Sequence, residues 1–402
     1  MLADALTLQL GYNAALVTLG SAALGLAAGA VGAFLYLRKR ALVSDAISHA
    51  TLPGLALAFL VLVALGQDGR NLPALLVGSA LSAAAGLWCV GWLSRATRLS
   101  EDAAIGAVLS VFFGFGIVLM TIIQSLGSGR QAGLEGFLLG STAGMLQSDA
   151  LIIAGGGTAV LLAVWVLRRP LLMIAFDADY ARLRGWDTDR YDMALMALVL
   201  AVTVTGLKIV GLILIVALLI IPAVAARFWS ESAPRVVALS AGLGGASGYV
   251  GAAISASAPD LPTGPIIVLT SFVLFCLSLL LAPARGVLAR ALRHRRLQYR
   301  VHLRQGLLAM AHGQPVYEAL TRRMLLRAGL MRADGVATET GRAEAGRALR
   351  DEHRWQALRR SETLGELANR DDGLTRADEV LTADQLDSLD ATFGLSEVPD
   401  GR

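Results

Sequence analysis

Residues 41–66, "ALVSDAISHATLPGLALAFLVLVALG", are the stretch that decides the fold. The run is mostly apolar and exceeds the roughly 20 residues that a helix needs to cross a bilayer. It also carries Asp45 and His49, whose four-residue spacing places both side chains on one face of a helix. Ionisable groups inside a span are costly and usually face a cavity or a partner. The stretch therefore predicts a membrane helix whose Asp45 and His49 face a cavity or a partner. Pro53-Gly54 is expected to break this helix near the pair.

The remainder of residues 1–282 is similarly apolar. Of the 402 residues, 55% are hydrophobic and only 16% are charged, and residues 283–402 hold 20 of the 35 basic and 17 of the 31 acidic side chains. Composition thus predicts a membrane domain, 1–282, followed by a charged soluble tail. The expected fold is an all-α polytopic membrane protein with about nine spans, at 13–37, 41–66, 72–94, 103–125, 150–168, 193–207, 209–226, 236–257 and 265–282.

The loops between these runs predict the orientation. Cytoplasmic loops carry an excess of Lys and Arg, and an outside N-terminus leaves few basic residues outside, among them Arg70 and Arg130. The tail is then cytoplasmic. The acidic N-terminus argues against a cleaved signal peptide, and we expect residues 134–145 to form a re-entrant or interfacial helix. Twelve basic residues fall inside: Arg38, Lys39, Arg40, Arg95, Arg98, Arg168, Arg169, Arg182, Arg184, Arg190, Arg227 and Arg235.

Asp45 and His49 offer a carboxylate and an imidazole, which together suit a divalent first-row metal ion such as Mn²⁺, Fe²⁺ or Zn²⁺. His49 is the only histidine in residues 1–282. Two ligands make a weak site, which a second copy in a symmetric dimer would complete. The spacing equally fits a structural role, in which Ser44 or Asp45 caps the helix and a backbone carbonyl satisfies His49.

The motif "ALVSDAISHATLPGLALAF" resembles the signature of the permeases of metal-uptake ABC transporters, which import manganese, zinc or iron. Three later stretches are similar to that family in the same order: "AFDADYARLRGWDTDRYD" (175–192), "LKIVGLILIVALLIIPAVAARF" (207–228) and "DLPTGPIIVL" (260–269). The resemblance covers residues 10–282. It implies that Asp45 and His49 line the metal path, and that an extracytoplasmic metal-binding protein and a second permease copy or paralogue are partners.

The ATPase of such a transporter must be a separate chain. A phosphate-binding loop of the G-x-x-x-x-G-K-[ST] type needs a lysine, and neither Lys39 nor Lys208 stands in that pattern. We therefore expect ATP hydrolysis to come from an ABC ATPase in trans, and this chain not to be an enzyme. A channel or an ion-coupled carrier would also fit a membrane domain without an ATPase motif.

The segment 176–192, between two spans, is the expected docking surface for that ATPase. It is polar and cytoplasmic by the charge rule, and "FDADYARLRGW" predicts a short helix. The family resemblance points to Asp177, Ala181 and Gly185 as the coupling positions. From the residues alone, a plain charged loop remains the alternative.

The tail begins with a basic stretch. Residues 283–304, "PARGVLARALRHRRLQYRVHLR", hold seven arginines and predict a juxtamembrane helix near anionic lipid headgroups. A nucleic-acid patch is the alternative interpretation.

Residues 305–402 predict a small winged-helix-like α+β domain. Val316, Leu320 and Met324 repeat at four-residue spacing, and Asp334-Gly335 is a tight-turn signal. Helix, hairpin and helix in this order over residues 300–392, with "GRAEAGRALRDEHRWQAL", resemble the iron- and manganese-dependent repressors. Ala357 stands where that family has a metal-binding carboxylate, four residues after the histidine matching His353. Thr382 and Gln385 predict a capped final helix.

The sequence therefore predicts an inner-membrane permease that moves a divalent transition metal into the cytoplasm by alternating access. Manganese is the expected cargo, with zinc or iron possible, and no permanently bound cofactor is expected. The alternative is a membrane-tethered, metal-responsive DNA-binding regulator. We expect weak DNA binding at most, because Arg322, Arg323 and Arg327 are offset by acidic residues from Glu362 onward.

Overall fold

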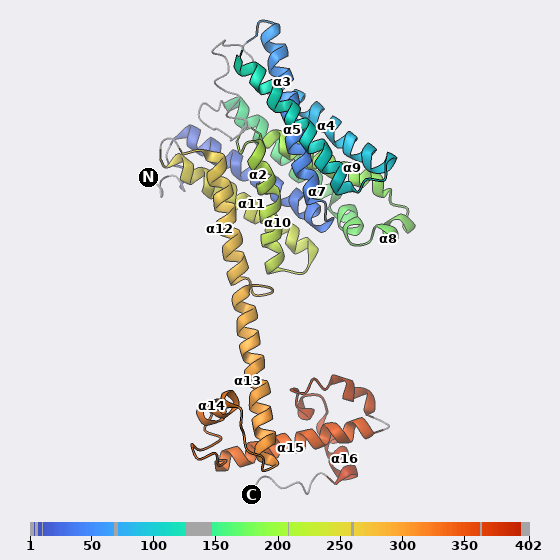
Figure 1. Cartoon of the computed structure of the whole chain (residues 1–402), viewed down its shortest axis with the longest axis vertical. Helices are drawn as coiled ribbons and strands as arrows, with labels where there is room; N and C mark the ends of the chain where they lie inside the picture. The colour runs from blue at the N-terminus through green and yellow to red at the C-terminus, as the bar shows by residue number, and fades with distance from the viewer. Residues whose placement is uncertain are drawn as a thin grey trace. The chain divides into compact units, whose positions relative to one another are not determined.

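The chain is almost entirely helical in its computed structural model, which describes residues 4, 7–9, 11–67, 71–125, 147–207, 209–258, 261–361 and 364–394. These residues form 14 α-helices, two 3-10 helices and one isolated β-bridge. The chain divides into two compact units, Met1–Ala289 and Arg290–Arg402, both built from helices (Figure 1).

The first unit is a bundle of long apolar helices joined by short polar segments. Seven of its described helices, α2, α3, α4, α5, α7, α11 and α12, are long and apolar enough to cross a membrane. The helices of this unit are α2 (Tyr12–Leu37), α3 (Ala41–Ala64), α4 (Leu72–Ala96), α5 (Glu101–Ser125), α7 (Gln147–Phe176), α8 (Ala178–Leu183), α9 (Thr188–Gly206), α10 (Leu212–Trp229), α11 (Ala233–Ala256) and α12 (Thr263–Leu281).

Each of the nine predicted spans corresponds to one described helix, although only seven meet the requirement of length and apolarity. The two that fall short are α9 and α10. The first begins with a charged turn containing Asp189, Arg190 and Asp192, and the second has only 18 residues. The predicted re-entrant helix at 134–145 lies outside the described residues.

Helices α2 and α11 share the most extensive helix–helix contact among the described residues of the bundle. A Cβ atom on Gly29 would lie 2.1 Å from the Ser240 carbonyl oxygen, and one on Gly248 would lie 2.1 Å from that of Ser21. The Ser240 hydroxyl donates to the Gly29 carbonyl at 2.6 Å. Small residues let membrane helices approach until their backbones touch, so these glycines have a packing role.

Helix α3 runs without interruption through Pro53 and Gly54, so the predicted break is wrong. Proline removes one intrahelical hydrogen bond, and the packing around it compensates. A Cβ atom on Gly54 would lie 2.0 Å from the Gly78 carbonyl oxygen, which shows that α4 presses directly on this turn. Both Pro53 and Gly54 are buried, and α3 therefore passes straight through the bundle beside α4 and α5 (Figure 1).

The outer faces of α4, α5 and α7 are apolar and exposed in the isolated chain. Trp88, Val111 and Trp165 are each more than 60% exposed. Trp88 stacks on Trp92 with ring centroids 6.3 Å apart. Since contiguous apolar surface of this extent is not stable in water, these faces are suited to lipid.

The second unit is a small helical domain with its own core. Trp355, Leu358 and Leu389 are almost fully buried, and the Trp355 indole donates to the Thr375 carbonyl at 3.0 Å. The capping box predicted from Thr382 and Gln385 is confirmed at the start of α16. Its elements are α13 (Val287–Ala311), α14 (Ala319–Arg327), α15 (Glu339–Arg360), η1 (Gly365–Arg370), η2 (Ala377–Glu379) and α16 (Ala383–Phe393).

The expected α+β wing is not confirmed. Between α14 and α15 the described residues contain one antiparallel bridge, from Met331 to Ala337, and no strand. The Thr338 amide donates to the Leu330 carbonyl at 3.0 Å, but the Thr338 side chain already caps α15 by accepting from Gly341. The chain therefore enters the next helix before a second pair of residues can extend the ladder.

The helix indicated by the spacing of Val316, Leu320 and Met324 is present as α14, but those residues do not form its buried face. Leu320 is 45% exposed, whereas Thr321 and Leu325 are buried. A Cβ atom on Gly306 of α13 would lie 2.7 Å from the Leu325 side chain and 2.8 Å from that of Thr321. Close packing of α13 on α14 thus buries the face of α14 that carries Thr321 and Leu325. Helix α13 also continues without a break across the predicted boundary between residues 304 and 305.

Candidate metal path and coupling segment

Asp45 and His49 come together on the first turns of α3, as their spacing predicts. The Asp45 Oδ1 and His49 Nε2 atoms are 3.4 Å apart, and the two side chains are 39% and 17% exposed. The imidazole also meets the Phe113 ring of α5 edge to face, with centroids 4.7 Å apart and planes at 79°. One side of the histidine is therefore closed by an apolar ring, while the carboxylate remains open.

The helix-cap interpretation of the motif does not hold. Helix α3 begins at Ala41, and its N-cap residue Arg40 makes no side-chain capping bond. The Ser44 hydroxyl donates to the Ala41 carbonyl at 2.6 Å. His49 Nδ1 is buried without a hydrogen-bond partner among the described residues. A buried ring nitrogen without a partner is costly, which a purely structural role for His49 does not explain.

The pair supplies two donor atoms of the kinds that transition metals bind, one carboxylate oxygen and one imidazole nitrogen. In the described part of the chain, no group of three or more His, Cys, Asp or Glu residues could hold a metal ion. Pro53 lacks the N–H that would bond to the His49 carbonyl one turn earlier.

The predicted coupling residues shape the segment between α7 and α9. The Asp177 carboxylate caps α8 by accepting from the Tyr180 amide at 2.8 Å. Ala181 is fully buried. Gly185 adopts a left-handed φ of 81°, which glycine reaches without strain, and its N–H donates to the Arg182 carbonyl at 2.9 Å. These three positions fold α8 and turn the chain after it.

Other residues of the segment provide its exposed surface, and the sequence analysis did not single them out. Leu183 is 87% exposed, Phe176 is 70% exposed and Tyr180 is 45% exposed. The available signal was the presence of large apolar side chains in an otherwise polar, predicted cytoplasmic segment. Exposed apolar residues of this kind mark interaction surfaces.

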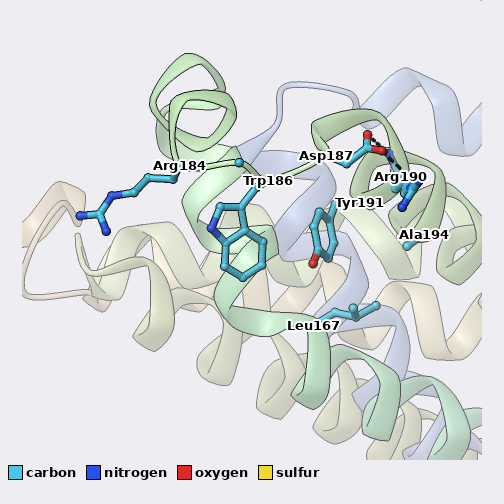
Figure 2. Close-up of a pocket in the computed structure, with 8 residues that line it drawn as sticks. Leu167, Arg184, Trp186, Asp187, Arg190, Tyr191 and Ala194 are labelled. Atoms are coloured by element: carbon cyan, nitrogen blue, oxygen red, sulfur yellow. Dashed lines mark hydrogen bonds and ion pairs between the residues drawn. The ribbon is translucent and has the colours of Figure 1, made fainter.

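An open cavity of about 490 Å³ lies beside α8. The Trp186 and Tyr191 rings line it side by side, with centroids 5.4 Å apart and planes tilted by 45°, and Leu167 of α7 lies below them (Figure 2). Arg190 pairs with Asp187 at 2.8 Å. The sequence analysis missed this cavity, because its walls come from both α7 and the start of α9. The cavity is lined by Leu167, Arg184, Gly185, Trp186, Asp187, Arg190, Tyr191 and Ala194.

A bundle of bilayer-length apolar helices with short polar connections is the architecture of a multi-pass membrane permease. Residues 12–282 match the family described as the ABC 3 transport family, and the chain belongs to that family. The match ends ahead of the tail, so it gives the repressor resemblance of residues 300–392 no support.

Two curated relatives are 40% identical to this chain. The "manganese transport system membrane protein MntC" of Bacillus subtilis (strain 168) aligns over 308 residues, which are 76% of this chain and 70% of the relative. The "zinc transport system membrane protein TroC" of Treponema pallidum (strain Nichols) aligns over 285 residues, 71% of this chain and 94% of the relative.

Two solved structures share the fold. "PsaBC from Streptococcus pneumoniae in complex with Fab" is 31% identical with a TM-score of 0.62, covering 73% of this chain and 100% of that one. The structure titled "An inward-facing conformation of a putative metal-chelate type ABC transporter" is 17% identical with a TM-score of 0.52, covering 65% of this chain and 83% of that one. The second likeness concerns the fold alone.

Proposed function

We propose that this chain is the permease subunit of an ABC importer that moves a divalent transition metal into the cytoplasm by alternating access. The Asp45–His49 pair carries the proposal, because it places a carboxylate and an imidazole together inside a membrane helix. Manganese is the expected metal, with zinc or iron as alternatives, and the names of the relatives support manganese and zinc.

A second permease, either another copy or a paralogue, completes the metal site. One chain offers a single carboxylate and a single imidazole, fewer donor atoms than such ions usually bind. Two facing pairs would supply two carboxylates, whose charge balances that of a divalent ion. Asp45 is 39% exposed in the isolated chain, so its carboxylate is accessible to such a partner.

We infer nine spans with the N-terminus outside and the tail in the cytoplasm. At 1.5 Å per residue, α9 and α10 are roughly 29 and 27 Å long, close to the thickness of about 30 Å of a hydrocarbon core. Contacts between helix ends fit this topology. Arg38 donates to the Ile174 carbonyl at 2.9 Å, and the Arg285 amide donates to the Phe228 carbonyl at 3.2 Å. Both contacts join helix ends that the excess of Lys and Arg in their loops assigns to the cytoplasmic side.

An ABC ATPase docks on residues 176–192 and powers the cycle, and an extracytoplasmic metal-binding protein delivers the ion. In this proposal Asp177, Ala181 and Gly185 give α8 its shape, while Leu183 and Tyr180 contact the ATPase. We propose that the tail is cytoplasmic and contacts the ATPase or the second permease. From residue 283 onward it carries 20 basic and 17 acidic residues. This near balance gives little net attraction for nucleic acid.

The test is uptake of manganese, zinc and iron, each alone and in competition, by vesicles that contain the chain with its ATPase. Wild type should accumulate at least one of these metals in an ATP-dependent manner. Asp45→Asn keeps the size of the side chain but removes the charge that attracts the ion, so uptake should fall by about tenfold or more. Unchanged uptake by Asp45→Asn, with the protein inserted normally, would refute the metal-path assignment.

A further inference from the structure

A cluster of four charged residues lies between the coupling segment and the helix that carries the metal pair. It consists of Arg38 at the end of α2, Arg40 at the start of α3, Glu101 at the start of α5 and Asp192 in α9. We call it the Asp192 cluster. Its members are separated by up to 154 residues in the chain, so only the packing of the bundle brings them together.

Asp192 is the shared anion of the cluster. Its Oδ2 atom pairs with the Arg38 Nη2 atom and lies 3.4 Å from Arg40 Nη1. The side chains of Arg38 and Asp192 are only 16% and 18% exposed. Arg38 also donates from Nη1 to the carbonyl of Ile174, which lies in the last turn of α7 just before α8. Asp192 and Arg38 thus connect both ends of the coupling segment to α2.

Arg40 extends the connection to α3 and α5. It is the residue before the first turn of α3, and its Nε atom lies 3.4 Å from Glu101 Oε1. Lys39 between the two arginines has a left-handed φ of 57°, a strained conformation for a residue with a Cβ atom. The Arg40 amide donates to the Leu35 carbonyl at 3.0 Å. This turn therefore links the end of α2 directly to the start of α3.

Asp45 follows Arg40 by five residues, or about 7.5 Å along an ideal helix. A displacement of α9 that pulls on Asp192 therefore acts on α3 close to the metal pair. The ion pairs are also poor candidates for simple stabilisers. Partly buried charges lose much of their Coulombic gain to desolvation, and the buried Arg38 Nε has no hydrogen-bond partner among the described residues.

We propose that Asp192 is a positioning residue, which transmits movement of residues 176–192 through Arg38 and Arg40 to α3 and so to the Asp45–His49 pair. This proposal rests on the proposed function. It adds a route by which events at the ATPase alter the geometry of the metal pair. The route passes through the Asp192 cluster rather than through the exposed surface of α8.

The experiment uses the full chain in complex with its ATPase and compares Asp192→Asn with the conservative variant Asp192→Glu. Asp192→Asn should reduce metal-stimulated ATP hydrolysis and metal uptake by about tenfold. Metal binding measured with manganese alone and co-purification of the ATPase should stay within about twofold of wild type, because the pair and the docking surface remain. Asp192→Glu, which keeps the charge, should restore most of the coupling.

Glu231→Gln is the matched control. Glu231 forms an ion pair with Arg285 at 2.9 Å, outside the Asp192 cluster, and this variant should leave uptake unchanged. Arg40→Gln provides a second variant on a more exposed residue, with 32% side-chain exposure, and should show the same loss of coupling with retained assembly.

Two results would overturn the proposal. One is normal metal-stimulated hydrolysis and uptake in both Asp192→Asn and Arg40→Gln. The other is parallel loss of thermal stability, ATPase binding and uptake in both variants, which would make the cluster a structural anchor only. Asp45→Asn is measured beside them. If Asp45→Asn retains uptake while Asp192→Asn loses coupling, the proposed metal path is wrong, but the proposed role of Asp192 in coupling still stands.

Discussion

The Phe113 ring of α5 covers one side of the His49 imidazole of α3, with ring centroids 4.7 Å apart. This contact holds the imidazole beside Asp45 and keeps water from that side of the ring. It joins two helices that are connected through a third, α4, and it makes the environment of the metal pair a product of the bundle. A first prediction concerns this aromatic contact.

Phe113→Ala should weaken metal binding by about tenfold, because groups that orient a ligand typically contribute 10- to 100-fold to affinity. The change leaves both donor side chains in place. The measurement is equilibrium binding of manganese and zinc to the purified complex. Phe115→Ala is the control, since that ring is 51% exposed on the same helix. Equal losses in both variants would indicate a general effect on α5.

His49→Gln should abolish most uptake, because an amide replaces the imidazole nitrogen that is a much better ligand for these ions. Ser44→Ala should have no effect on uptake, since the Ser44 hydroxyl donates to the Ala41 carbonyl of its own helix. The measurement is metal uptake by vesicles that contain each variant, compared with wild type. The reverse pattern, with Ser44→Ala defective and His49→Gln active, would contradict the assignment of His49 to the metal path.

Leu183→Glu should reduce co-purification of the ATPase by about tenfold, because it places a charge on a leucine that is 87% exposed at the end of α8. The spans should remain folded. Ala181→Arg should also release the ATPase, but by a different route. Ala181 is fully buried, and a large side chain there should unfold α8 locally. Full ATPase retention by both variants would contradict the docking assignment.

A fragment of residues 287–402 should fold by itself, because α13 contributes Gly306 to the packing of α14 and Arg304 to an ion pair with Asp351 of α15. We expect it to bind DNA no better than micromolar at physiological salt. We also expect no tight Mn²⁺ site, since Ala357 replaces the carboxylate of the resembling family. Nanomolar, sequence-selective DNA binding that strengthens with Mn²⁺ would favour the regulator alternative.

Burial raises the pKa of Asp351 in the tail, although the Ala377 amide and the Arg304 guanidinium oppose the shift. A carboxyl with a raised pKa binds its proton more tightly in the folded state than in the unfolded one. Its contribution to stability is therefore greatest below the ordinary Asp value of 3.8 and declines as the pH rises through the raised pKa. Urea unfolding of the fragment at several pH values measures this decline.

Asp351→Asn should remove that pH dependence and should destabilise the fragment less at neutral pH than Asp351→Ala does. The Asn oxygen can still accept from the Ala377 amide, which donates to Asp351 at 2.6 Å. Asp351→Ala should cost about 2 kcal/mol, because it leaves that buried amide without a partner. Similar losses in the two variants would show that the charge itself stabilises the tail.

Local spacing in the sequence was sufficient for several features of this protein. The four-residue spacing of Asp45 and His49 fixed their meeting on one helix face, because an α-helix repeats nearly every four residues. Thr382 and Gln385 determined a helix start, since a capping box involves only neighbouring residues. Each of the nine predicted apolar runs likewise coincides with a described helix, because the hydrophobicity of a run is a local property of the sequence.

Only the tertiary structure decided the features that depend on distant residues. Phe113 covers His49, Asp192 binds Arg38 across 154 residues, and Ala181 is buried while Leu183 is exposed. No local period encodes which helix packs against which face, because that choice minimises the free energy of the whole bundle. The continuity of α3 through Pro53 has the same cause, since contacts with α4 outweigh the loss of one backbone hydrogen bond.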